Sequence, residues 1–281
     1  MKAFDKTIQF YIFDGNPSGR IMCELSNWNG RAYKVSRSDL SLFEKRDDSH
    51  NTGVYFLIGK DEDNSDTIYI GEAEDIIKRL KQHLTDKTYW NDCIVVLSKD
   101  NNLNKAHVKY LEHEFYKLAK DANRFIVTNQ NIPQKSSISE FDEAMLGEFI
   151  ENAKLLVNTL GYKAFETIND SLKSSINQKS SVKYFIKAAR GAQATGIPVP
   201  DGFAILKGSK MAISTTPSLS DYIAKWRNKL LNNETVNSDY VFIKDFVFSS
   251  PSLAASVVMG RNANGKTEWK TEENKSLSDS I

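Results

Sequence analysis

Two short apolar runs, separated by a charged turn, dominate the pattern of hydrophobic and polar positions along this chain. The first run spans 52–59 (TGVYFLIG), and the second spans 68–71 (IYIG). The segment between them, from Asp61 to Asp66, is acidic and polar, so it cannot belong to a core. Two β-rich runs joined by a polar loop predict a β-hairpin.

An amphipathic helix is predicted directly after this hairpin, beginning at Asp75. Its apolar positions recur at helical spacing, at Ile76, Ile77, Leu80 and Leu84. Arg79 and His83 are four residues apart, so their side chains should lie next to each other on one side of the helix. The predicted unit is therefore a hairpin with one tyrosine in each strand, Tyr55 and Tyr69, followed by a helix that carries an arginine and a histidine.

A further strand and helix are predicted after this unit. The nearly continuous apolar run 93–97 is typical of a buried central strand. Asn104 is a good N-cap, and the helix that follows should run from Lys105 to about Lys120. At 100° per residue, Glu112 lies at the border of the apolar face of this helix. A carboxylate at that border can face a cleft without being fully desolvated.

The remaining chain divides into one part before the hairpin and two parts after the second helix. Residues 1–50 are predicted to form a small β-rich module. Residues 136–181 combine a helix with a flexible linker, 169–181, that is rich in serine, asparagine and lysine. Residues 182–281 have strand and helix patterns of their own, which predict a separate small α+β domain. A chain of 281 residues agrees with two domains and an extra module, and the predicted fold class is α+β.

Composition narrows the class of protein. Lysine and arginine total 37 against 36 acidic residues, so the formal net charge is +1, and any nucleic-acid surface must be a local patch. The two cysteines, Cys23 and Cys93, form no CxxC pair, which argues against a zinc ribbon and a disulfide scaffold. The first residues lack the apolar core of a signal peptide, and no apolar run approaches the length of a membrane span. We expect a cytoplasmic protein with no membrane partner.

The chain resembles the GIY-YIG nuclease family in four ordered features: Gly53-Val54-Tyr55, Tyr69-Ile70-Gly71, Arg79 and Glu112. The family is named for two such triplets on adjacent strands, which a helix with an arginine follows. For residues 51–135, the resemblance implies a small mixed three-stranded sheet flanked by helices. It also implies a metal-dependent endonuclease that hydrolyses phosphodiester bonds in DNA.

The resemblance implies a role for each site residue. Glu112 would be the ligand of a single divalent metal ion, Mg²⁺ or Mn²⁺, which suits a hard cation that keeps several waters. Arg79 offers a fork of donors to phosphate oxygens. Tyr55 and Tyr69 would share the alignment and deprotonation of a water molecule, and which of them is the base stays open. His83 would relay a proton or bind phosphate, and its alternative is a surface histidine at a helix end.

Two assignments have competitors. Glu114 lies two residues after Glu112, but the Leu111-Glu112 phrase and the helix geometry favour Glu112. The family often has an asparagine beyond this helix that helps to orient the site. In this chain Asn129 and Asn131 both lie in that region, so this role stays open.

The C-terminal phrase 249–270 resembles an uncharacterised domain that often follows GIY-YIG nucleases. It is also similar to the restriction-enzyme and adenine-methylase-associated domain, which is thought to bind DNA, including DNA with modified bases. Arg261, Asn262, Asn264 and Lys266 are polar and close together between a helix end and a predicted hairpin. Our hypothesis is that these four residues contact DNA, and the alternative is an ordinary solvated turn.

The sequence thus predicts a metal-dependent endonuclease of DNA restriction or repair with a C-terminal DNA-binding module. The first alternative is a non-catalytic reader of modified DNA that has kept the same fold. The second is a nuclease directed at RNA. Neither the target sequence nor the oligomeric state can be predicted from the chain.

Overall fold

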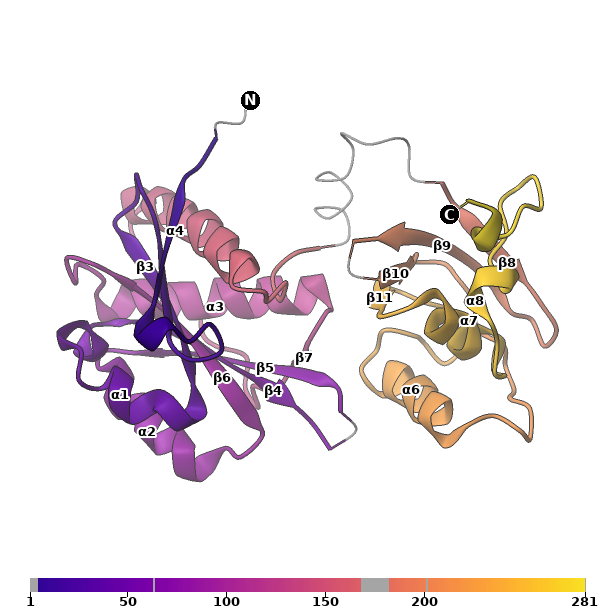
Figure 1. Ribbon diagram of the computed structural model, residues 1–281, viewed down its shortest axis with the longest axis horizontal. Helices are drawn as coiled ribbons and strands as arrows, with labels where there is room; N and C mark the ends of the chain where they lie inside the picture. The colour runs from indigo at the N-terminus through magenta and orange to yellow at the C-terminus, as the bar shows by residue number, and fades with distance from the viewer. Residues whose placement is uncertain (1–4, 63, 168–181, 201, 281) are drawn as a thin grey trace. The chain divides into compact units, whose positions relative to one another are not determined.

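The computed structural model describes residues 5–62, 64–167, 182–200 and 202–280. It contains two compact units, Met1–Glu166 and Thr167–Ile281. Both units combine helices with a β-sheet (Figure 1), so the predicted α+β class is confirmed. The predicted linker 169–181 lies outside the described residues. Within the described ranges, no helix is both long enough and apolar enough to cross a membrane.

One seven-stranded sheet, in the order β1-β2-β3-β6-β4-β5-β7, forms the centre of the first unit. Its strands are β1 (Ile8–Ile12), β2 (Ile21–Leu25), β3 (Gly30–Ser36), β4 (Gly53–Lys60), β5 (Asp66–Ala73), β6 (Trp90–Ser98) and β7 (Ile126–Val127). All neighbours are antiparallel except β5 and β7, which are parallel. The predicted hairpin is confirmed as β4–β5, with Tyr55 opposite Gly71. The predicted buried strand is confirmed as β6.

The first fifty residues do not form a module of their own, which corrects the prediction. They contribute β1, β2 and β3 to the same sheet, which therefore has seven strands instead of three. The reason is that the buried strand β6 has two edges, and β4 pairs with only one of them. A buried strand edge with unpaired backbone groups is costly, and β3 satisfies it from Gly30 opposite Ser98 to Ser36 opposite Asp92.

Helices cover both faces of this sheet. They are α1 (Leu40–Phe43), α2 (Ile76–Asp86), α3 (Lys105–Ala122) and α4 (Glu140–Thr159), with short 3₁₀ turns at Phe13–Gly15, Arg37–Asp39 and Asp47–His50. Side chains of β4 alternate between the faces, as a strand requires. Val54 and Phe56 join the core under α3 and α4, while Tyr55 and Leu57 join the core under α1 and α2.

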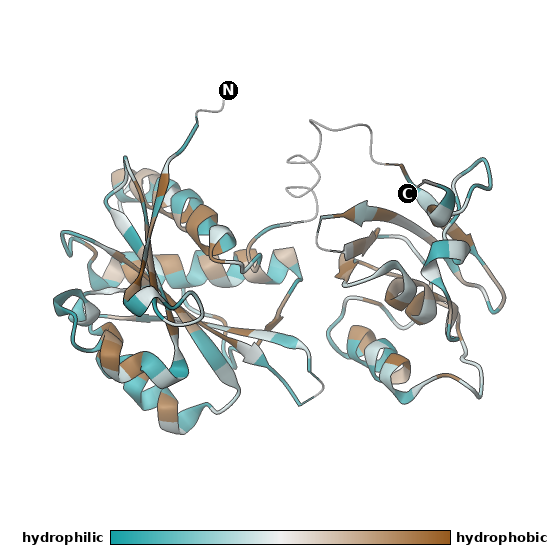
Figure 2. Ribbon diagram, viewed as in Figure 1, coloured by the Kyte–Doolittle hydropathy of each residue, from teal (hydrophilic) through white to brown (hydrophobic). Residues whose placement is uncertain are grey.

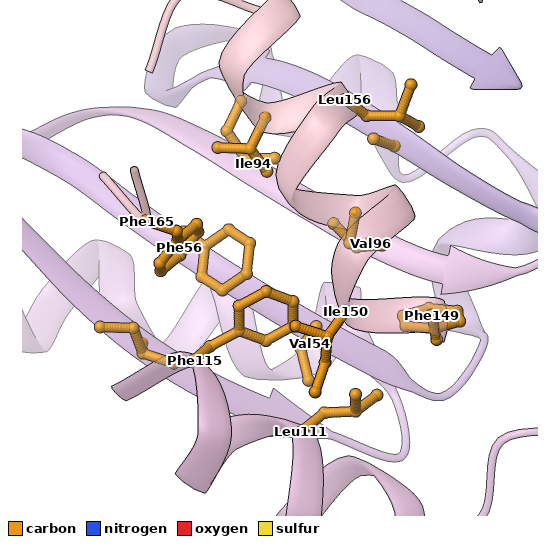
Figure 3. Packing of buried hydrophobic residues seen from close by; sticks show 14 of the residues in the cluster. Val54, Phe56, Ile94, Val96, Leu111, Phe115, Phe149, Ile150, Leu156 and Phe165 are labelled. Carbon is orange, nitrogen blue, oxygen red and sulfur yellow. The ribbon is translucent and has the colours of Figure 1, made fainter. Parts of the chain in front are cut away.

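The helix α4 belongs to the first unit and not to a connecting segment, which is a second correction. Its residues Leu146, Ala153 and Leu156 are fully buried in the larger core. Figure 3 shows this core, in which Phe56 lies against Phe115, with ring centroids 5.0 Å apart. Hydrophobic and hydrophilic bands alternate along α3 and α4 in Figure 2, as expected for helices with one face on a sheet.

The second unit has a four-stranded antiparallel sheet in the order β11-β10-β9-β8. Its elements are β8 (Tyr184–Lys187), β9 (Gln193–Val199), β10 (Gly202–Ile205), α6 (Asp221–Asn232), β11 (Phe246–Phe248), α7 (Pro251–Met259), α8 (Gly265–Glu268) and a final 3₁₀ turn, Leu277–Ser280. Its core joins Phe203 and Phe248 of the sheet with Trp269 and the buried residues of α7.

Candidate active site

The predicted site residues come from four elements of the first unit. Tyr55 and Tyr69 lie on β4 and β5, Arg79 and His83 lie on α2, and Glu112 lies on α3. Four of them, all except Tyr55, line one cavity of about 370 Å³. Tyr55 is next to the cavity, in contact with one of the residues that line it: its hydroxyl is 2.8 Å from Nε2 of His83. The structure therefore brings all five residues together.

The cavity lies beside the open edge of β5. The short strand β7 pairs only with Thr67 and Ile68, so the next residues of β5 have a strand, β4, on one side and none on the other. The side chain of Asn129 takes that place, since its Oδ1 accepts a hydrogen bond from the backbone N–H of Ile70 (3.0 Å) and its Nδ2 donates to the Ile70 carbonyl (2.7 Å). This contact fixes Asn129 in the wall of the cavity, whereas Asn131 lines the cavity with an exposed side chain.

Glycine at position 71 is required by the packing of Tyr55. A Cβ atom at Gly71 would lie 2.3 Å from both Cζ and Oη of Tyr55, a separation that real contacts do not reach. The Tyr55 ring crosses the backbone of β5 at this point, on its way to His83. The second triplet thus needs its glycine because the tyrosine of the first triplet passes over it.

His83 is neutral at pH 7 in this environment. Burial lowers its pKa to about 4, and the nearby cations Arg79 and Lys87 act in the same direction. Its Nδ1 is buried and has no hydrogen-bond partner within the described part of the chain. The neutral imidazole is therefore held by one hydrogen bond, which joins its Nε2 to the hydroxyl of Tyr55 (2.8 Å).

The two tyrosines differ in access and in ionisation. Burial raises the pKa of both hydroxyls, and the guanidinium of Arg79 opposes this rise in each case. Tyr55 is only 1% exposed, whereas Tyr69 lines the cavity. The two phenol rings are neighbours, with ring centroids 6.3 Å apart. Tyr69 is therefore the phenol of the pair that a bound ligand can reach, whereas Tyr55 is held by its hydrogen bond to His83 (2.8 Å).

Glu112 is a carboxylate whose charge is poorly compensated. Burial raises its pKa to about 7, and the carboxylate of Glu72 adds to the rise. Its competitor Glu114 instead forms an ion pair with Lys135 (3.2 Å) and does not line the cavity. The geometry therefore favours Glu112 as the functional carboxylate.

The donor set around Glu112 fits a hard divalent cation. A half-buried carboxylate with a raised pKa gains when a cation neutralises it. The described ranges contain no group of three histidine, cysteine or acidic side chains that could hold a metal ion. A cation at Glu112 would therefore complete its shell with waters and phosphate oxygens, which is the usual habit of Mg²⁺.

Sequence reasoning did not identify Lys87, which ends α2 and lines the cavity. Its Nζ lies 4.1 Å from the ring centroid of Tyr69, a cation–π contact. The pKa of Lys87 is lowered by burial and by Arg79. The sequence contained a signal, because Arg79, His83 and Lys87 follow one another at intervals of four residues, with Lys87 as the extended residue directly after α2.

The four residues predicted to contact DNA in the second unit have mostly local roles. Arg261 forms an ion pair with Glu268 (2.6 Å), and Nδ2 of Asn262 donates to the Ser218 carbonyl (3.0 Å). Asn264 caps α8, where its Oδ1 accepts from the backbone N–H of Lys266 (3.1 Å). Lys266 is exposed like Asn262 and Asn264, but its side chain makes no such local contact among the described residues.

Comparison with known proteins yields one match. A family model described as "Domain of unknown function (DUF4357)" matches residues 184–281, which is about a third of the chain. No curated protein and no solved structure matches the chain. The similarity concerns the second unit and leaves its activity open.

Proposed function

We propose that this protein is a metal-dependent endonuclease of the GIY-YIG type that hydrolyses phosphodiester bonds in DNA. One observation carries the proposal: the five side chains selected from the spacing of the sequence lie together around one cavity. They come from two paired strands and two helices, and the strand β6 pairs with β4 beside them, as the family core would need. Separate surface roles for these residues would not require such a convergence.

The scissile phosphate would bind between the cations of α2 and the carboxylate of α3. Arg79 presents a planar fork of donors that matches phosphate oxygens. Lys87 adds a second positive charge on the same side of the cavity. Negative charge that develops on the phosphate during attack would be stabilised by these groups without any rearrangement.

Tyr69 would accept the proton of the attacking water. Its phenol lines the cavity, whereas Tyr55 is buried against His83, and Arg79 lies beside Tyr69. The guanidinium of Arg79 favours the phenolate form of Tyr69. His83 and Tyr55 would act by positioning the Tyr69 ring, which lies against both of their rings.

Glu112 would hold Mg²⁺ or Mn²⁺. When bound, such an ion supplies Lewis-acid stabilisation of the leaving oxygen and of the developing charge. Glu112 also explains why the bare site would bind cations more weakly in acid, because a proton competes for its carboxylate with a pKa of about 7.

The experiment is cleavage of supercoiled plasmid and single-stranded DNA with Mg²⁺ or Mn²⁺. The wild type is compared with Glu112→Gln and with the matched control Glu114→Gln. We expect cleavage by the wild type and by Glu114→Gln, and none by Glu112→Gln or in the presence of chelator. Equal cleavage by all three proteins would remove Glu112 from the site.

The same assay separates the alternatives. DNA binding without metal-dependent cleavage would favour a non-catalytic reader that has kept this fold. Preferential cleavage of single-stranded RNA over DNA, lost in Glu112→Gln, would favour an RNA-directed nuclease.

A further inference from the structure

We propose that the loop 129–133 is a base-contacting wall of the cavity, in which Gln130, Asn131 and Ile132 contact the nucleobase next to the scissile phosphate. This inference rests on the proposed function, because it names the part of the substrate that this site would select. It assigns specificity to Gln130 and Ile132, for which the sequence suggested no role, and to Asn131, which was a candidate for orienting the site.

The loop is held at both ends. At its start, the backbone N–H of Thr128 donates to the Ile68 carbonyl (2.9 Å), and Asn129 binds both backbone groups of Ile70. At its end, Nδ1 of His113 lies 2.7 Å from the carbonyl oxygen of Pro133. The three residues between these anchors are exposed and line the cavity. A short segment fixed at both ends holds its side chains in place, as selective contacts require.

The two amides have free hydrogen-bonding groups. Neither Gln130 nor Asn131 has a side-chain partner among the residues that the structure describes. An amide presents a donor and an acceptor side by side, which is the pattern that matches the edge of a base and adenine in particular. An amide carries no charge, so it offers little to a phosphate compared with lysine or arginine.

Ile132 adds an apolar contact at the same place. Its side chain is 69% exposed, and of the large exposed hydrophobic residues in the described ranges it is the one that lines this cavity. Apolar side chains at such positions pack against bases or the thymine methyl group. An isolated exposed isoleucine would be unremarkable elsewhere on a surface, but here it lies beside two unpaired amides.

The two sides of the cavity thus differ in chemistry. Arg79 on α2 and Lys87 just after α2 are positive, with Asp86 beside them, and these two cations suit the sugar–phosphate backbone, whereas the loop is uncharged. Phosphate contacts position a nucleic acid, and base contacts select its sequence. Affinity for the nucleic acid would then come from Arg79 and Lys87, and selectivity among bases from the loop 129–133.

The test measures base preference in full-length protein that carries Glu112→Gln to prevent cleavage. Short duplex and single-stranded DNA pools with a randomised centre are bound in Mg²⁺, and the bound sequences are counted. The loop variant is Gln130→Ala with Asn131→Ala and Ile132→Ser. Lys87→Gln serves as the backbone-contact variant, and Ile213→Ser is the matched control, since Ile213 is an exposed isoleucine of the second unit.

We expect the loop variant to lose about tenfold of the preference among bases and to keep the salt dependence of binding. Lys87→Gln should weaken binding to all sequences alike and reduce the salt slope by about 1. Ile213→Ser should change neither. The comparison of the two pools shows whether the contacted base belongs to a duplex or to a single strand.

Unchanged base preference in the loop variant would overturn this inference, even if Glu112-dependent cleavage by the wild-type protein confirms the nuclease. The reverse can also occur. If the wild type does not cleave but the loop variant loses a measurable base preference, the nuclease proposal fails and the loop stands as a base-contacting site. Absence of both cleavage and base preference would overturn both.

Discussion

Glu112 has a charge that the folded protein stabilises poorly in the absence of a cation. Its pKa is raised by burial and by the negative charge of Glu72. Glu72 is itself in an ion pair, with its Oε1 2.9 Å from Nζ of Lys105. Binding sites commonly lower the stability of the folded protein in this way, because their groups are arranged for the ligand and not for the empty protein.

Replacing Glu112 by glutamine should therefore stabilise the metal-free protein at alkaline pH. The folded state holds the carboxyl proton more tightly than the unfolded state, with a pKa of about 7 against 4.5. Ionisation thus costs the wild type stability as the pH rises from 4.5 to 7, and the full cost is present above 7. After a discount for solvent screening, we expect Glu112→Gln to be about 1–2 kcal/mol more stable at pH 8.

Urea unfolding in chelator, followed at several pH values, measures this difference. The gain should shrink as the pH falls from 7 towards 4.5, and the control Glu114→Gln should show no gain. A difference that is the same at pH 5 and pH 8 would show that Glu112 is not in the environment described above.

The two tyrosines should respond differently to removal of the hydroxyl group. Tyr69→Phe should reduce the cleavage rate by about 10²–10⁴-fold, as expected for loss of a proton acceptor, and leave DNA affinity nearly unchanged. Tyr55→Phe should reduce the rate less and lower stability by about 1 kcal/mol, because Nε2 of His83 loses its partner. Single-turnover rates and thermal unfolding of both variants test this, and a larger rate effect at Tyr55 would reverse the assignment.

At the scale of the elements, the site depends on how β4, β5 and α2 fit together. The Tyr55 ring can reach His83 only because β5 has no side chain at Gly71. Asp75 begins α2 at the end of the same strand pair, where its carboxylate accepts from the backbone N–H of Lys78 (3.0 Å). This cap sets the start of the helix, and hence the direction in which Arg79 and His83 point.

A methyl group at position 71 should therefore disturb the site. Gly71→Ala would place a Cβ 2.3 Å from the Tyr55 oxygen, so we expect a loss of about 1–3 kcal/mol from overpacking and a loss of cleavage. Gly147→Ala is the matched control, because Gly147 lies inside α4 with nothing within 4 Å of the added methyl. It should gain about 0.5–1 kcal/mol from helix propensity. Urea unfolding of the two variants shows whether their effects have opposite signs.

At the scale of the whole molecule, each hydrophobic core belongs to one unit. The clusters around Phe56 and around Tyr55 use residues up to Phe165, and the cluster around Phe203 uses residues from Tyr184 onwards. Each unit also has its own sheet. A unit with its own core and sheet is expected to fold alone.

We therefore predict that residues 182–281, expressed alone, unfold cooperatively. Near-UV circular dichroism reports this, since Trp269 is fully buried in the core of that unit. Residues 1–167 should keep metal-dependent cleavage but bind DNA more weakly if the second unit contributes to binding. A second unit without a cooperative transition would mean that it needs the first one in order to fold.

Much of the fold and the site could be predicted from local patterns. The β4–β5 hairpin, the helices α2 and α3 and the strand β6 follow from runs and spacings within about fifteen residues. The pairing of β3 with β6 could not be predicted in this way, because Gly30 and Ser98 are far apart along the chain and no local pattern selects the partner of a strand edge.

The sequence by itself determined which residues we propose for the chemistry, because two triplets, an arginine and a glutamate follow one another in a recognisable order. Only the tertiary structure decided how they work together. Burial beside Arg79 makes His83 neutral, the Tyr55 ring crosses Gly71, and Glu112 acquires its raised pKa from Glu72 and from its surroundings. The physical reason is that pKa values, access and contact distances depend on which distant segments pack together, and residue types and spacings do not contain that information.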